Sequence, residues 1–165
     1  MEEKMTKKEK QLILQDVSTA LEMFFEATDT KQAGEMVWRL FQAGLTNAEV
    51  REYSGEMRQE SASFTKHLQN FIKELGLHYE AQIDVSVPYN PDRLLVKVAE
   101  FFELWPNAQG ELWDLFFHAL GSEEFNEWDN VIVSNFAFEY KQLSDLLESL
   151  SLTHCCKDAT PPQRP

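Results

Sequence analysis

The chain has 165 residues and a net charge of −13, from 15 basic and 28 acidic side chains, and 43% of its residues are hydrophobic. This length and apolar content are typical of one folded domain that needs no disulfide or metal to hold its core, and they exclude a disordered body. The acidic balance disfavours nucleic acid and anionic membranes as partners and favours a basic protein. No apolar run approaches the roughly 20 residues that cross a bilayer, and the first residues lack the apolar core of a secretory signal. We therefore expect a cytoplasmic protein that does not enter the membrane.

Apolar residues at helical spacing predict six helices, separated by cap and turn residues. The expected helices cover residues 7–28, 31–43, 46–75, 91–105, 108–120 and about 123–150. Capping boxes formed by Thr6 with Glu9 and by Thr46 with Glu49 mark two of the helix starts. Pro91 marks a third, because proline is favoured at the first position of a helix.

Two segments are less regular. In one, Ile83, Val85 and Val87 alternate with polar residues, which predicts a short extended segment or edge strand near 82–87. The other, 129–140, fits either the start of the last helix or two short strands. The leucine stripe that follows it favours the helix.

The expected fold is therefore mainly α, a single-domain bundle of five or six helices over residues 1–152. The segment near 82–87 is also the best candidate for a linker, which would divide the bundle into halves 1–80 and 89–152. The tail 153–165 has three prolines in its last five residues, and we expect it to be disordered.

No arrangement of residues predicts catalysis or a cofactor. The chain lacks the paired Glu-x-x-His motifs of di-iron bundles, a glycine-rich phosphate loop and a nucleophile elbow. Asp114 and His118 share one helix face with Glu111, but a solvated histidine beside carboxylates explains this spacing without a metal. Cys155 and Cys156 are neighbours in the tail and are interpreted as free thiols. We therefore expect a protein that is not an enzyme and holds no cofactor or metal.

The acidic charge is concentrated in the C-terminal half. Residues 1–88 carry 10 basic and 15 acidic side chains (−5), residues 89–152 carry 3 and 12 (−9), and the tail adds +1. The same half has a surplus of large apolar side chains, which belong either to the core or to a partner surface. These features predict an inhibitor, an adaptor or a mimic of nucleic-acid charge that binds a basic protein, with a homo-oligomer left open. The predicted partner-binding residues are Trp105, Trp113, Phe117, Glu123, Glu124, Glu127, Trp128 and Asp129.

Two stretches in the N-terminal half point to a different class of protein. Residues 35–50 read EMVWRLFQAGLTNAEV and residues 63–77 read SFTKHLQNFIKELGL. The first resembles the first helix and turn of the LuxR-type DNA-binding domain, whose members commonly carry an E-x-V-x-x-L-x-x-G-L-T-N-x-E-I pattern, and the second resembles the end of its recognition helix. The resemblance implies a DNA-binding transcriptional regulator with a helix-turn-helix at 35–77. Its DNA-binding residues would be Arg51, Arg58, Lys66 and His67.

Helical phase gives another interpretation of the same stretch. The 25 residues from Val50 to Leu75 turn through about 2,500°, within roughly 20° of seven whole turns. Apolar residues stay on one helix face throughout, and the apolar face does not shift to another side of the helix at Ser54 or Gly55. This pattern predicts one long bundle helix over 46–75 rather than two helices joined by a turn.

Overall fold

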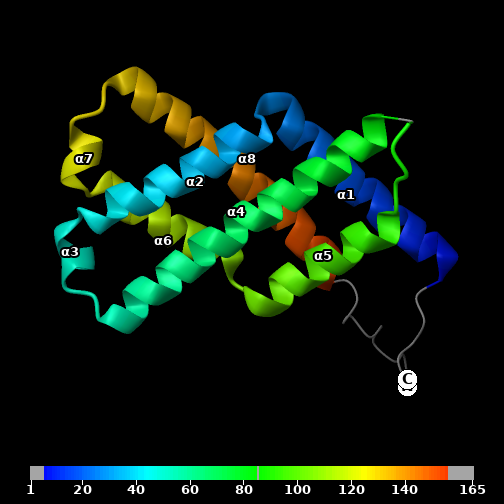
Figure 1. The fold of residues 1–165 in the computed structure, drawn as a ribbon, viewed down its shortest axis with the longest axis horizontal. Helices are drawn as coiled ribbons and strands as arrows, with labels where there is room; N and C mark the ends of the chain where they lie inside the picture. Colours follow the sequence, from blue (N-terminus) through cyan, green and yellow to red (C-terminus); the bar gives the residue numbers. More distant parts are fainter. Residues whose placement is uncertain (1–5, 85, 156–165) are drawn as a thin grey trace, which may run out of the picture.

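The computed structural model describes residues 6–84 and 86–155, and within these ranges the protein is helical and contains no strand (Figure 1). Its helices are α1 (Lys7–Ala27), α2 (Thr30–Leu45), α3 (Ala48–Arg51), α4 (Gly55–Ile83), α5 (Pro91–Leu104), α6 (Ala108–Leu120), α7 (Glu123–Asn126) and α8 (Asn130–Cys155). The mainly α fold is confirmed. The described helices outnumber the expected five or six because the single-turn helices α3 and α7 form in two of the connections.

Side-chain caps fix several helix starts as the sequence predicts. The Thr6 hydroxyl accepts a hydrogen bond from the Glu9 amide at 3.3 Å, and the Glu9 carboxylate accepts one from the Thr6 amide at 2.8 Å. At α5, the Asn90 side chain accepts from the Asp92 amide at 3.0 Å, with Pro91 in the first turn. These bonds satisfy amides that have no partner inside the helix.

The continuous helix predicted over 46–75 is wrong, because the chain leaves the helix between α3 and α4. The Ser54 hydroxyl accepts from the Met57 amide at 3.2 Å and starts a new helix there. The capping box at Thr46 is also absent: its hydroxyl donates to the Ala43 carbonyl, and Asn47 caps α3 instead. Val50 of α3 is buried, as are Phe64 and Leu68 of α4, so buried apolar residues occur on both sides of a break of three residues.

The extended segment predicted near 82–87 is wrong as well. Helix α4 passes through Gly76 and ends only at Ile83, and the residues from Ser86 to Asn90 form a loop. Val85 lies outside the described residues. Ile83 and Val87 are exposed, so their alternation with polar residues does not mark the buried face of a sheet.

The helical interpretation of 129–140 holds, although α8 begins at Asn130 rather than near 123. Asp129 caps it by accepting from the amides of Val131 and Ile132, each at 2.9 Å. Helix α8 runs to Cys155, three residues into the segment expected to be disordered, and residues 156–165 lie outside the described part of the chain.

The long helices share one hydrophobic core. Helix α2 packs against both α4 and α6, while α1 packs against α8 and α4. In Figure 1 α4 crosses the near face of the molecule, with α6 and α8 behind it. The largest fully buried side chains come from α1, α2, α4, α5, α6 and α8, so both sides of the 84–90 loop contribute to the same core.

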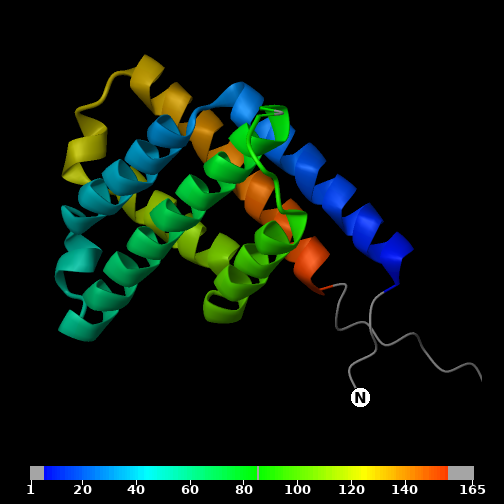
Figure 2. The same ribbon diagram turned by 45° about the vertical axis from the view of Figure 1, so that its right-hand side comes forward.

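The short helices α3 and α7 lie at the same end of the molecule in both views (Figures 1 and 2). The Arg51 guanidinium of α3 reaches the Glu123 carboxylate of α7 at 3.5 Å. This end therefore joins two connections that are about 70 residues apart in the chain, and α6 ends there.

Candidate protein-binding surface

Helix α6 exposes large apolar side chains although its opposite face is in the core. Trp113 is 49% exposed, Phe117 52% and Leu120 38%. Its buried side chains are Ala108, Leu112, Leu115, Phe116 and Ala119. Because the helix is apolar nearly all round, its core contacts leave one flank of large side chains in solvent. We call Trp113, Phe117 and Leu120 the aromatic surface.

Rings beneath the aromatic surface hold it in place. Phe116 stacks on Tyr140 of α8 with ring centroids 4.2 Å apart and planes 15° apart. Trp113 lies 6.1 Å from Tyr140 and 6.2 Å from Phe117, centroid to centroid. A partner would therefore meet rings already packed against a rigid base, which lowers the entropy lost on binding.

Carboxylates gather where α6 faces α3 and α4. Burial raises the pKa of Glu111, and the nearby carboxylates of Asp114 and Glu60 raise it further. Burial likewise raises the pKa of the Tyr53 phenol, with added contributions from Asp114 and Glu49. The carboxylates that act on Glu111 and Tyr53 come from α3, α4 and α6. We call Glu49, Glu60, Glu111 and Asp114 the acidic rim.

Hydrogen bonds from the α2–α4 corner fix α6 against α3. The Tyr53 hydroxyl lies 2.7 Å from Nε2 of His118, and the two rings meet edge to face. The Asn47 side-chain amide donates to the His118 carbonyl at 2.9 Å. Since His118 follows Phe117 directly, these two bonds hold the last turns of α6 and with them the aromatic surface.

Only two of the four predicted aromatic partner-binding residues, Trp113 and Phe117, form this exposed surface. Trp105, at the end of α5, packs edge to face on Phe64 at 5.0 Å between centroids. Trp128 packs against the core between Phe125 and Phe136, at 4.8 Å and 4.7 Å. Neither of these two tryptophans adds to the aromatic surface.

The predicted acidic residues lie around α7 rather than on α6. Glu123 pairs with Arg51, Glu127 is exposed, and Asp129 caps α8. The side chain of Glu124 lies outside the described part of the structure. The acidic rim consists of other carboxylates, on α3, α4 and α6. Of these, Glu111 and Asp114 share the i, i+3 spacing that places side chains on neighbouring parts of one helix face.

The residues implied by the LuxR resemblance are spread over different surroundings. Arg51 is paired with Glu123, while Arg58 lines a small crevice with Tyr53 and His118. Lys66 is exposed, and Nδ1 of His67 lies 2.7 Å from the Ser63 carbonyl of the preceding turn. The structure thus does not bring these four side chains together.

The described residues hold no group of three or more His, Cys, Asp or Glu side chains placed to bind a metal. None of the helices in this part of the chain is long and apolar enough to span a bilayer. In comparisons with protein-family models, curated proteins and solved structures, nothing matches this chain. What the protein does must therefore be inferred from its own geometry.

Proposed function

We propose that the protein is a non-enzymatic interaction protein that binds a basic segment of another protein through the aromatic surface and its acidic rim. The observation that carries the proposal is the pair of half-exposed rings, Trp113 and Phe117, in the middle of α6, a helix that also carries Glu111 and Asp114 of the acidic rim.

Each part of this surface has a separate physical role. Tryptophan and other large rings are typical hot-spot residues, since truncating one at the centre of an interface costs about 2 kcal/mol or more. The acidic rim adds electrostatic steering, which raises the association rate with a positively charged partner. The net charge of −13 acts in the same sense at longer range and disfavours pairing between two copies of this chain.

In-cell photo-crosslinking tests the proposal. Phe117 is replaced by the photoreactive p-benzoyl-phenylalanine, and in a matched control the same residue replaces Met23, which is 67% exposed on α1. We expect a discrete adduct at position 117 that position 23 does not give, with the captured peptide rich in lysine and arginine. Equal labelling at both positions, or capture of an acidic peptide, would overturn the proposal.

The purified partner then allows a quantitative measurement. Trp113→Ala should weaken binding by about thirtyfold, which corresponds to about 2 kcal/mol. Met23→Ala should leave the affinity unchanged, because Met23 lies on a different helix.

A DNA-binding regulator is the second candidate. The break at Glu52–Ser54 gives helix α2, the single-turn helix α3 and the long helix α4 in succession, the order that the LuxR resemblance implies. Glu49, Glu52, Glu56 and Glu60 lie along the same stretch and oppose phosphate binding. A salt series on duplex DNA separates the candidates: a regulator binds at low salt with an affinity that falls steeply as salt rises, and absence of retention at low salt excludes it.

A further inference from the structure

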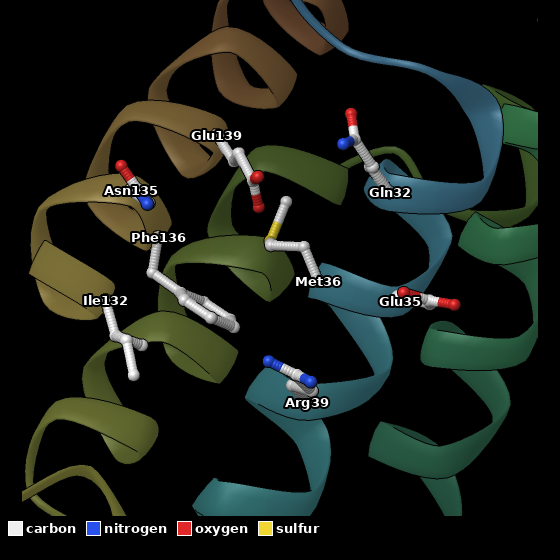
Figure 3. Close-up of a pocket in the computed structure, with 8 residues that line it drawn as sticks. All are labelled: Gln32, Glu35, Met36, Arg39, Ile132, Asn135, Phe136 and Glu139. Atoms are coloured by element: carbon white, nitrogen blue, oxygen red, sulfur yellow. The ribbon is translucent and has the colours of Figure 1, made fainter. Parts of the chain in front are cut away.

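A cleft opens between α2 and the first turns of α8. Its volume is about 210 Å³, and Figure 3 shows its two walls, with α2 on one side and α8 on the other. The floor is apolar: Met36 is 2% exposed and Phe136 6%, and Ile132 adds an aliphatic edge.

Two opposite charges line the cleft. Glu139 projects from α8 toward Met36, and Arg39 projects from α2 toward Phe136 (Figure 3). Within residues 6–84 and 86–155, neither side chain makes a hydrogen bond or an ion pair. Arg39 and Glu139 thus both line the cleft without forming an ion pair with each other.

The carboxyl group of Glu139 is partly withdrawn from water. Burial raises its pKa, the Arg39 guanidinium opposes the rise, and the carboxylate of Asp29 adds to it. A desolvated carboxylate gains from any cation that enters the cleft, because the low local dielectric strengthens the attraction.

The other polar side chains of the cleft are mostly engaged elsewhere. Gln32 accepts from the Asp29 amide as part of the capping box of α2. Glu35 lies 3.7 Å from Lys31 and points away from the cleft in Figure 3. Arg39 and Glu139 are therefore the two charges free to meet a ligand.

We propose that this cleft binds a small zwitterion of the amino-acid class, with its ammonium group on Glu139, its carboxylate on Arg39 and an aliphatic side chain over Met36 and Phe136. The volume limits the size of the ligand. It corresponds to about seven water molecules at roughly 30 Å³ each and lies below the roughly 300–1,000 Å³ of pockets for drug-sized ligands. A free amino acid is of this size.

This proposal is independent of the proposed function, since the cleft shares no residue with the aromatic surface or the acidic rim. Loss of one activity would leave the other intact.

Amide NMR spectra of the full chain test the ligand class. The protein is titrated with L-leucine and with two analogues that each lack one charge: leucinamide, without the carboxylate, and 4-methylpentanoate, without the ammonium. We expect shift changes confined to α2 and α8 around the cleft, with leucine bound at least about tenfold more tightly than either analogue. No shift change with leucine up to about 10 mM, or equal binding of all three compounds, would overturn the proposal.

Charge exchange provides the matched variants. Arg39→Glu and Glu139→Arg should each abolish leucine binding, because each leaves two like charges in the cleft. The double variant should recover binding with the ligand reversed, a result that a purely structural role for either residue does not produce. Glu148→Gln, at an exposed position of α8, serves as the control and should bind as the natural chain does. Retained binding in both single variants, or none in the double variant, would contradict the assignment, and the spectra themselves report whether each variant is folded.

Discussion

Replacing Gly76 with alanine should destabilise the fold, although the same replacement at Gly34 should stabilise it. Both glycines lie inside helices and have negative φ, so neither needs glycine for its backbone conformation. They differ in what a new Cβ would meet. At Gly76 it would lie 2.2 Å from Oγ1 of Thr30 and 3.2 Å from the Cβ of Thr30, whereas at Gly34 nothing lies within 4 Å.

The expected magnitudes follow from two opposing terms. Alanine is favoured over glycine inside a helix by about 0.5–1 kcal/mol, and this gain applies at both sites. At Gly76 the forced contact adds an overpacking cost of about 1–3 kcal/mol. A rotation of the Thr30 side chain cannot clear the contact fully, because its Cβ is itself 3.2 Å away. We therefore expect a loss of up to about 2.5 kcal/mol at Gly76 and a gain of about 0.5–1 kcal/mol at Gly34.

Urea denaturation followed by circular dichroism measures both effects, with the midpoint as readout while the slope stays constant. The difference between the two variants isolates the contact, since the helix preference cancels. Thr30→Ala combined with Gly76→Ala should recover part of the loss, with a coupling of at least about 0.5 kcal/mol. Equal stability of Gly76→Ala and Gly34→Ala would refute the close approach of α4 to the start of α2.

Three further substitutions probe other parts of the fold. Thr65→Val should raise the free energy of unfolding by about 1 kcal/mol in urea, because the buried Oγ1 of Thr65 has no hydrogen-bond partner in the described part of the chain. A decrease would show that this hydroxyl is satisfied in solution. Asn47→Ala should lower the same quantity by about 1–3 kcal/mol, since it removes the cap of α3 and the bond to the His118 carbonyl, and an unchanged midpoint would contradict that link. Burial holds the pKa of His78 below its ordinary value of 6.5, so the unfolded chain binds the proton more readily and stability should fall as the pH drops below about 6.5. The urea midpoint should therefore fall as the pH is lowered from about 8 to about 5. His78→Gln should reduce this dependence on pH, whereas the control His67→Gln, at an exposed site, should leave it unchanged.

The sequence predicted a helix well where a capping motif or a proline marks its first residue. The Thr6 capping box and the Asn90–Pro91 pair act within a few residues, so the sequence contains all the information that they need. The leucine stripe after residue 140 gave the type of α8 for the same reason, because a long periodic run is less sensitive to tertiary context.

The break between α3 and α4 could not be predicted from phase. A stripe shows which side of the chain faces the core, and it cannot distinguish one helix from two that present the same side. The deciding interactions are the Ser54 cap, which is local, and the Tyr53–His118 contact, which joins residues 65 positions apart. The sequence pattern contains no trace of the second one.

The same limit applies to the candidate surface. Composition showed a surplus of aromatic residues in the C-terminal half, but the fold decides which of them remain exposed. Trp105 and Trp128 pack against the core, while Trp113 and Phe117 stay about half exposed on one flank of α6. The sequence did not predict the cleft between α2 and α8. Arg39 and Glu139 are 100 residues apart, and only the packing of the two helices places both side chains in the same cleft.

The two proposed binding events, a basic segment at the aromatic surface and leucine in the cleft, should depend differently on salt concentration. A basic segment approaching the aromatic surface is attracted by the acidic rim and by the net charge of −13, mostly through solvent. Raising the salt from about 0.1 M to about 1 M shortens the screening length from about 10 Å to about 3 Å, so this binding should weaken strongly. A zwitterion carries no net charge and gains little from the long-range field. Its attraction arises within a few ångströms of Arg39 and Glu139, and the partial burial of Glu139 reduces screening there. Leucine binding should therefore change little over the salt range that disrupts the protein contact, and a parallel loss of both would mean that the ligand follows the overall charge rather than the paired charges of the cleft.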